Sequence, residues 1–456
     1  MKRSEAARFA RWSALLAFAL AATTGGIYVH RKWVAHVEKK NAPPAPSANV
    51  ERQSSGLTFS KVEGNRTIFT VHASKSTDFR GEDASLLEDV RVTIFGKNGD
   101  RNDVLHTESC QFAKADGSIQ CSGDVQMELQ SAADAARFVQ AGGLPRGMTR
   151  VMTSGMTFER ATGRAQTVKP VKFSFPNGSG QGIGAVYSSD DGQLRLVRDV
   201  ELLLDASGAR KPKLESTEQN EVTIKGSSLQ FSKQQRTIIL GGPVTANSKT
   251  QELKAGELTV DLNEAFRVES LVATQGAGKE LPEVSMHGAS GISALRAEKL
   301  RSFFAPGGWI TTVKAEGNVY GSSPEGALRA EAGELEMFPR VNEAKHLRLD
   351  GNVQMETRDT KNGATRMMKT SALQLTFAGG APGQPSRVQH GETLEHGTME
   401  WTDSAGVRSK LDADKLAVEF GAKGKAQQLV ATGNVQSERE STGNPIQRAS
   451  PSPGMV

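Results

Sequence analysis

The chain has 456 residues, with 56 Lys and Arg, 51 Asp and Glu, 47 Gly and 2 Cys. Two cysteines exclude a disulfide-dense scaffold and a four-cysteine zinc site. Residues 1–40 carry a net charge of +6, so the other 416 residues sum to −1. A body without net positive charge has no overall attraction to phosphate backbones, which argues against a nucleic-acid partner.

The first segment along the chain is an apolar run from Trp12 to Val29, 18 residues without a charged side chain. A helix of this length spans about 27 Å, enough for the hydrocarbon core of a bilayer. A cleaved signal peptide is the alternative, because the run is rich in small residues. We favour an uncleaved anchor, since a second basic pair, Arg31 and Lys32, follows the apolar run. We therefore predict a cytoplasmic stub and a transmembrane anchor over residues 1–40.

The segments next to the body are rich in Pro, Ser and Ala. Residues 41–49 read NAPPAPSAN, a composition that gives a semi-stiff spacer. The last residues are rich in Ser, Pro, Gly and Asn, as in disordered termini. We predict a Pro-rich linker over residues 41–55 and a disordered tail over residues 441–456.

The body of the chain is a series of repeats that predict β-strands. In each repeat an apolar residue is followed by a second one five positions later, then by a polar turn. An alternating run that ends in Gly-(Asn, Asp or Pro)-Val follows the turn. Alternation at period two indicates strands rather than helices. The five-residue offset recurs at Leu105/Cys110, Val151/Met156, Ile224/Leu229, Leu253/Leu258, Leu295/Leu300, Met368/Leu373 and Leu411/Leu416.

A parallel β-helix and a stack of antiparallel hairpins could both use such units. Turn-forming pairs such as Asp116-Gly117 and Asp191-Gly192 lie between the alternating runs, which favours antiparallel hairpins. On a flat strand, an offset of five places two residues on opposite faces, so a bend or bulge must lie between them. We predict two facing antiparallel sheets joined along one side.

The two cysteines fit one of these hairpins. If residues 114–117 form a four-residue loop, Cys110 lies opposite Cys121 and Phe112 lies opposite Ile119. Opposed β-carbons are about 4.5–5.5 Å apart, close to the range of a disulfide. A two-residue turn would break this register, and two buried thiols are the alternative. We predict a Cys110–Cys121 disulfide, which requires an oxidising compartment.

Two parts of the body resemble known families. Residues 56–81, GLTFSKVEGNRTIFTVHASKSTDFRG, and residues 87–96, LEDVRVTIFG, resemble the LptC family of lipopolysaccharide export. Residues 224–435 resemble the OstA/LptA-type repeat, Leu-x-Ala-x-x-Leu followed by Leu-x-x-x-Gly-Asn-Val. Residues 411–435 match it well, and residues 328–353 match it with two extra residues. We therefore predict an LptC-like β-jellyroll domain over residues 56–210 and an OstA/LptA-like β-repeat domain over residues 211–440.

The resemblance implies an all-β fold, an elongated antiparallel β-jellyroll or β-taco after one transmembrane helix, whose groove holds the acyl chains of lipid A. It implies a single-pass inner-membrane protein with most of its chain in the periplasm. The implied partners are lipopolysaccharide or a related glycolipid, an ABC transporter of the LptB, LptF and LptG type, and an LptA-like or LptD-like β-jellyroll. An ordinary LptC is far shorter, so this chain would add part of the LptA bridge. We expect the jellyrolls to join end to end by β-augmentation.

Alternating strands place apolar side chains inward and polar ones outward. An apolar interior that is open along one edge could admit a branched, sugar-headed lipid from the side. Plain core packing is the alternative for each residue, and a structural or adhesive scaffold with a filled core is the alternative function. The candidate groove residues are Phe59, Phe69, Val71, Phe112, Ile119, Val125, Met127, Phe173, Phe175, Phe231, Val244, Val319, Val353, Met355, Val418 and Val435.

The sequence carries no pattern that predicts catalysis. The eight histidines are scattered, and neither HExxH nor GxSxG occurs. The Gly-rich run over residues 178–184 fits neither a dinucleotide-binding motif nor a P-loop, and we expect a hairpin turn there. A carbohydrate-active enzyme would need clustered carboxylates on neighbouring strands, which we do not find. We therefore expect a non-enzymatic protein without a cofactor or a metal.

Overall fold

A computed structural model of the chain describes residues 50–96, 101–130, 149–205, 221–248, 251–278, 280–286, 293–324, 326–339, 343–358, 364–379, 386–403, 406–421, 426–441 and 444–449. The predicted anchor over residues 1–40 lies outside these ranges. Within them, no helix of the length and apolarity needed to cross a bilayer occurs.

The described residues form 28 β-strands. The first nine are β1 Val50–Glu63, β2 Arg66–Phe79, β3 Ala84–Phe95, β4 Asn102–Ala113, β5 Ile119–Leu129, β6 Thr149–Glu159, β7 Arg164–Phe175, β8 Gly178–Ser188 and β9 Gln193–Asp205. The next ten are β10 Glu221–Gly226, β11 Ser228–Ser232, β12 Thr237–Asn247, β13 Gln251–Leu262, β14 Val268–Thr274, β15 Glu283–Met286, β16 Ala294–Arg296, β17 Lys299–Phe304, β18 Ile310–Ser323 and β19 Gly326–Met337. The last nine are β20 Ala344–Arg358, β21 Thr365–Ala378, β22 Arg387–Thr393, β23 Gly397–Thr402, β24 Arg408–Ala413, β25 Lys415–Phe420, β26 Ala426–Thr432, β27 Gln436–Ser441 and β28 Asn444–Ala449.

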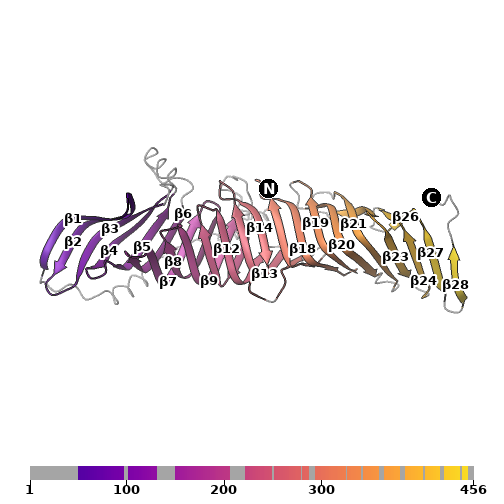
Figure 1. Ribbon diagram of the computed structural model, residues 1–456, viewed down its shortest axis with the longest axis horizontal. Coiled ribbons are helices and arrows are strands. Elements are labelled where there is room, and N and C mark those ends of the chain that lie inside the picture. Colours follow the sequence, from indigo (N-terminus) through magenta and orange to yellow (C-terminus); the bar gives the residue numbers. More distant parts are fainter. Residues whose placement is uncertain are drawn as a thin grey trace, which may run out of the picture.

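All of these strands belong to one antiparallel sheet. They stack side by side along the long axis of the molecule, from β1 at one end to β28 at the other (Figure 1). The prediction of an all-β antiparallel fold is confirmed. The two facing sheets that we predicted are joined through their strands, so by hydrogen bonding they are a single folded sheet.

The strands bend near their middles. Ile224 and Leu229 are both buried although they are five residues apart, because β10 ends at Gly226 and β11 begins at Ser228. Both strands pair with β9 and with β12, so the ladder continues through the bend. The predicted bend between apolar residues offset by five is confirmed here. A similar break separates β16 from β17 and β24 from β25.

The Gly-Asn-Val ending supplies the bend in strands that are not interrupted. In β20, Gly351 and Asn352 have positive φ angles of 78° and 46°, and the register with β21 skips from Asp350 to Val353. Glycine adopts this conformation freely, and Asn tolerates it better than most residues. The two residues form a bulge that turns the strand and returns the valine to the interior. Residues 317–318 of β18 repeat this geometry.

The bends divide the sheet into two layers, which we call wall 1 and wall 2. Wall 1 comprises residues 69–73, 90–95, 101–107, 125–130, 171–175 and 200–205, continuing into β10, β15, β16, β23, β24, β27 and β28. Wall 2 comprises residues 110–113, 119–121, 157–159, 185–189, 193–196 and 257–262, continuing into β11, β14, β17, β22, β25 and β26. The hairpin turns of both walls lie on the side opposite the bends, which we call the mouth.

Two predicted boundaries are wrong. β1 begins at Val50 and pairs with β2, so residues 50–55, which we expected in the linker, belong to the sheet. β28 pairs with β27, so the tail that we expected to be disordered contains a strand. In both cases the adjacent strand offers backbone hydrogen-bond partners to a polar segment, which composition alone does not reveal. The boundary near residue 210 falls between β9 and β10, which pair with each other, and it stays a prediction.

Candidate binding interior

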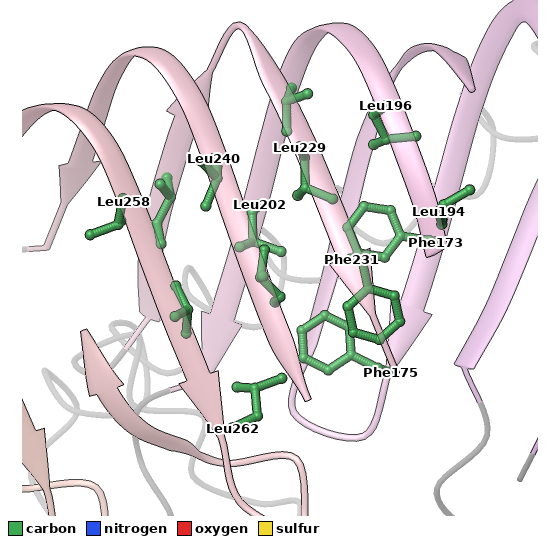
Figure 2. Close-up of a cluster of buried hydrophobic side chains, with 14 of the residues drawn as sticks. Phe173, Phe175, Leu194, Leu196, Leu202, Leu229, Phe231, Leu240, Leu258 and Leu262 are labelled. Atoms are coloured by element: carbon green, nitrogen blue, oxygen red, sulfur yellow. The ribbon is translucent and has the colours of Figure 1, made fainter. Parts of the chain in front are cut away.

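The space between the two walls is lined by one apolar cluster. Buried and exposed residues alternate along β2 and β3, and the buried ones point between the walls. The cluster extends from Ile68 to Val418 and includes side chains of both walls. Figure 2 shows some of its Phe and Leu side chains enclosed by the bent strands. The alternating pattern therefore produces an apolar interior along most of the sheet.

The structure places nearly all candidate groove residues on this inner side. Phe59, Phe112 and Met355 are partly buried and pack against the cluster. Val435 is half-buried and lies between β26 and β27. The other twelve are members of the cluster: Phe69, Val71, Ile119, Val125, Met127, Phe173, Phe175, Phe231, Val244, Val319, Val353 and Val418. That these residues bind lipid stays a prediction.

Side chains of the two walls touch and fill the interior. Phe69 of wall 1 meets Phe158 of wall 2 edge to face, with 4.9 Å between the ring centroids. Phe69 and Phe231 are 0% exposed, so no space large enough for a water molecule is open beside either ring. At these positions the interior is packed like a protein core and is not an open trough.

Three phenylalanines stack across the interior at the end of β7. Phe173 and Phe175 of wall 1 lie against Phe231 of wall 2, with ring centroids 6.4 and 6.0 Å apart (Figure 2). The Gly-rich run, which we expected to be a hairpin turn, is instead part of β8. A Cβ on Gly180 would lie 2.4 Å from the Phe173 ring. The glycines therefore make room for the aromatic stack inside a strand.

A disulfide joins Cys110 of β4 to Cys121 of β5. Phe112 pairs with Ile119 in the same hairpin, as the four-residue loop predicts. Both cysteines are buried in the apolar cluster. The bond ties two neighbouring strands of wall 2 beside the bend, where the backbone register between them is interrupted.

Comparison with known proteins supports the resemblance of the first domain. Residues 15–205 match the family model described as "Lipopolysaccharide-assembly, LptC-related". These residues, which make up less than half of the chain, are similar to that family. The matched part thus ends with β9. The match does not extend over the OstA/LptA-like repeats, which stay a prediction.

No curated protein matches the chain. A solved structure titled "Crystal Structure of TcdB2-TccC3-Cdc42" aligns at 9% sequence identity with a TM-score of 0.09. The alignment covers 84% of this chain and 27% of that one, so this chain spans about a quarter of that protein. At this score the likeness carries no argument about fold or function.

Contacts between the two walls bridge the mouth of the matched part and the turns next to it. Lys233 Nζ, after β11 of wall 2, donates to the Leu129 carbonyl oxygen of wall 1 at 2.6 Å. Asn177 Nδ2, in the turn between β7 and β8, donates to the carbonyl oxygens of Ala265 and Phe266 at 2.8 and 3.1 Å. The hairpin turns of opposite walls are therefore held against each other.

A buried polar cluster at the same edge was not predicted from the sequence. Asp103 is 1% exposed and contacts Arg101 and Tyr187. Burial raises the pKa of Asp103 to about 6, although Arg101 and the hydrogen bonds from Tyr187 and Gln130 oppose the rise. Burial, followed by the negative charge of Asp103, raises the pKa of Tyr187. The available signal was an acidic residue at an inward position of an alternating run, two residues before Leu105.

The outer surface carries two hollows. One of about 400 Å³ lies over β6 to β10, with Met152 and Leu203 exposed among charged neighbours. The other, of about 460 Å³, is lined by Trp401 and by charged side chains of β20, β21, β23, β24 and β27. Among the residues with assigned positions, no three metal-ligating side chains come together. The interior between the walls is therefore the feature that best matches a site for an apolar ligand.

Proposed function

We propose that this protein is a single-pass inner-membrane protein that conveys lipopolysaccharide toward the outer membrane, with the acyl chains held between the two walls. The observation that carries the proposal is the apolar cluster that runs from Ile68 to Val418. This cluster lies inside a sheet that is folded in two because its strands bend near their middles. The match of residues 15–205 to an LptC-related family of lipopolysaccharide assembly supports the choice of cargo.

The folded sheet suits this cargo for energetic reasons. Each methylene exposed to water costs about 0.8 kcal/mol, so one long acyl chain costs roughly 10 kcal/mol outside a membrane. An interior between two walls can cover the chains, and a mouth along one side leaves room for sugars outside. A closed barrel would admit such a branched molecule only through its ends.

Acyl chains enter this interior by displacing side chains, because the walls already touch. Met127 and Met368 belong to the cluster and Met355 packs against it. Their flexible thioethers adapt to ligands of varied shape. At the β1 end, Phe59 and Phe112 are only partly buried, with ring centroids 5.3 Å apart. The interior is only partly covered at this end, and we place the first insertion of a chain there.

The two ends of the sheet fit partners that add strands. Among the strands described, β1 pairs only with β2, β26 only with β25, and β28 only with β27. Such edges offer free backbone groups to a strand of another chain. The β1 edge would face an ABC transporter of the LptB, LptF and LptG type. The β26 and β28 edges would meet an LptA-like or LptD-like jellyroll.

Site-specific photo-crosslinking in cells tests the proposal. A photoreactive amino acid at Phe112 or Met355 lies at the border of the interior, whereas one at Gln126 lies on the exposed outer face of β5. We expect lipopolysaccharide to be captured at Phe112 and Met355 in the full chain, with little capture at Gln126. Capture at Gln126 alone would contradict the proposal.

A structural scaffold with a permanently filled core is the second candidate. The closed packing around Phe69 and Phe231 favours it. It predicts no lipid capture at Phe112 or Met355 in a protein that folds and reaches the envelope. The same crosslinking experiment therefore separates the two functions.

A further inference from the structure

Five buried polar residues connect the two walls across the mouth of the matched part. Wall 1 contributes Arg101 just before β4, Asp103 near the start of β4, and Gln130 after β5. Wall 2 contributes Tyr187 at the end of β8 and Ser189 just after it. We call these five residues the latch cluster. None is more than 8% exposed.

The contacts of the latch cluster cross from one wall to the other. The Tyr187 hydroxyl donates to Asp103 Oδ2, and Arg101 Nη2 donates to the Ser189 carbonyl oxygen. Within wall 1, the backbone N–H of Gln130 donates to Asp103 Oδ1 at 2.9 Å. Arg101 Nε lies 2.7 Å from Asp103 Oδ2 as an ion pair that is not aligned for a hydrogen bond. Asp103 and Arg101 thus hold each other as well as the opposite wall.

The turn between β8 and β9 is shaped around the Arg101 guanidinium. Gly192 in this turn has a φ of +65°, and a Cβ there would lie 1.9 Å from Arg101 Nη1. Any other residue would both strain the turn and collide with the arginine. The backbone of wall 2 therefore leaves space for a side chain of wall 1. This fit indicates that the contact between the two walls is a specific one.

Other contacts across the mouth flank the latch cluster. On the β1 side, Lys61 Nζ donates to the Ala161 carbonyl oxygen at 2.9 Å. The Arg160 guanidinium lies 5.5 Å from the centre of the Phe59 ring. On the other side is the hydrogen bond of Lys233 to wall 1. The mouth is therefore closed by a row of polar contacts, of which the latch cluster is the most buried.

A polar closure can be released more easily than an apolar one of the same size. When a buried ion cluster opens, its charges regain hydration that offsets much of the lost attraction. Separating two apolar surfaces has no such compensation. We propose that the latch cluster is a releasable closure, which holds the mouth shut and admits an acyl chain when it opens. The identity of the cargo rests on the proposed function, whereas opening of the mouth can be measured without any lipid.

Tyr187→Phe in the full chain tests the closure, because it removes one cross-wall hydrogen bond and keeps the ring. Loss of a hydrogen bond to a charged acceptor predicts about tenfold faster amide hydrogen exchange in peptides covering residues 101–107 and 185–189. Capture of purified lipopolysaccharide by a photoreactive group at Phe112 should quicken by a similar factor. The matched control is Ser270→Ala, which removes a partly buried 2.6 Å hydrogen bond to Asp261 within wall 2. It should change neither measurement.

The outcomes separate the closure from the proposed function. Unchanged exchange in Tyr187→Phe would overturn the closure, and faster exchange with unchanged capture would overturn its role in admitting lipid. Faster exchange with no capture in any form of the protein, wild type included, would overturn the proposed function and leave the closure supported. If Tyr187→Phe does not fold, Lys233→Met removes a neighbouring cross-wall contact and should give the same direction of change in both readouts.

Discussion

Asp103 should make closure of the mouth depend on pH. Its pKa in the folded protein is about 6, against an ordinary value of 3.8, because burial disfavours the charged form. The cations of Arg101 and Lys233 and the hydroxyl of Tyr187 face it, and Tyr187 keeps its proton because its own pKa is raised. The contribution of Asp103 to stability is therefore fully present below about pH 4 and is lost as the pH rises through 6. The difference corresponds to about 3 kcal/mol, or about a hundredfold in the opening equilibrium.

Hydrogen exchange of wild type and Asp103→Asn over pH 4 to 7 measures this effect. The variant replaces the carboxyl group of Asp103 with a neutral amide of the same shape. All other titratable groups are the same in both proteins. Their effects on opening therefore cancel when the opening constant of wild type is divided by that of the variant. After correction for intrinsic exchange rates, wild-type opening relative to the variant should rise about fiftyfold across this range in peptides covering residues 101–107. Peptides covering residues 257–262 of wall 2 should show no such rise. A ratio that stays constant with pH would refute the reasoning.

Three further substitutions test the fold by urea denaturation. Gly180→Ala should lower the free energy of unfolding by about 1–3 kcal/mol, because the added Cβ meets the Phe173 ring. The control is Ser179→Ala on the outer face, which should change the free energy of unfolding by less than about 0.5 kcal/mol. Cys110→Ser opens a disulfide that spans 11 residues and should cost about 3 kcal/mol; equal midpoints for oxidised wild type and variant would contradict this. Asn352→Ala places a Cβ-bearing residue without a local hydrogen bond at positive φ and should cost about 1 kcal/mol more than Asn352→Gly.

The repeat pattern predicts the bent strands because the bend is encoded locally. A glycine followed by an asparagine before a valine needs only its own backbone freedom to form the bulge, as at residues 351–352. The five-residue offset then follows, since both apolar residues must face inward on either side of the break, as Ile224 and Leu229 do. The pairing of Phe112 with Ile119 was predictable for the same reason, because turn length fixes the register of a hairpin.

The packing of the interior could not be predicted, because it depends on how distant side chains fit together. Alternation shows that Phe173 and Phe231 face inward, but not that they stack and close the space between the walls. The glycines of β8 read as a turn, since their partners in space, the rings of Phe173 and Phe175, lie on another strand. A pattern of inward residues does not distinguish a groove from a core.

The latch cluster could not be predicted from the sequence for a related reason. Arg101 and Ser189 are 88 residues apart in the chain, and Asp103 and Tyr187 are 84 apart. Each pair meets only because turns of opposite walls face each other across the mouth. The inward position of Asp103 indicates that it has a buried partner, but it does not indicate which residue that partner is. The partners meet only in the folded sheet, where the turns of the two walls lie opposite each other.

The distance between the walls, with and without lipid, tests the central claim most directly. Spin labels at Lys172→Cys in wall 1 and Arg195→Cys in wall 2 occupy exposed outer positions, and the native cysteines are held in their disulfide. Because the interior is filled, we expect purified lipopolysaccharide to lengthen the distance by about 4 Å, the thickness of one hydrocarbon chain. An unchanged distance in protein that demonstrably holds lipopolysaccharide would contradict acyl-chain binding between the walls.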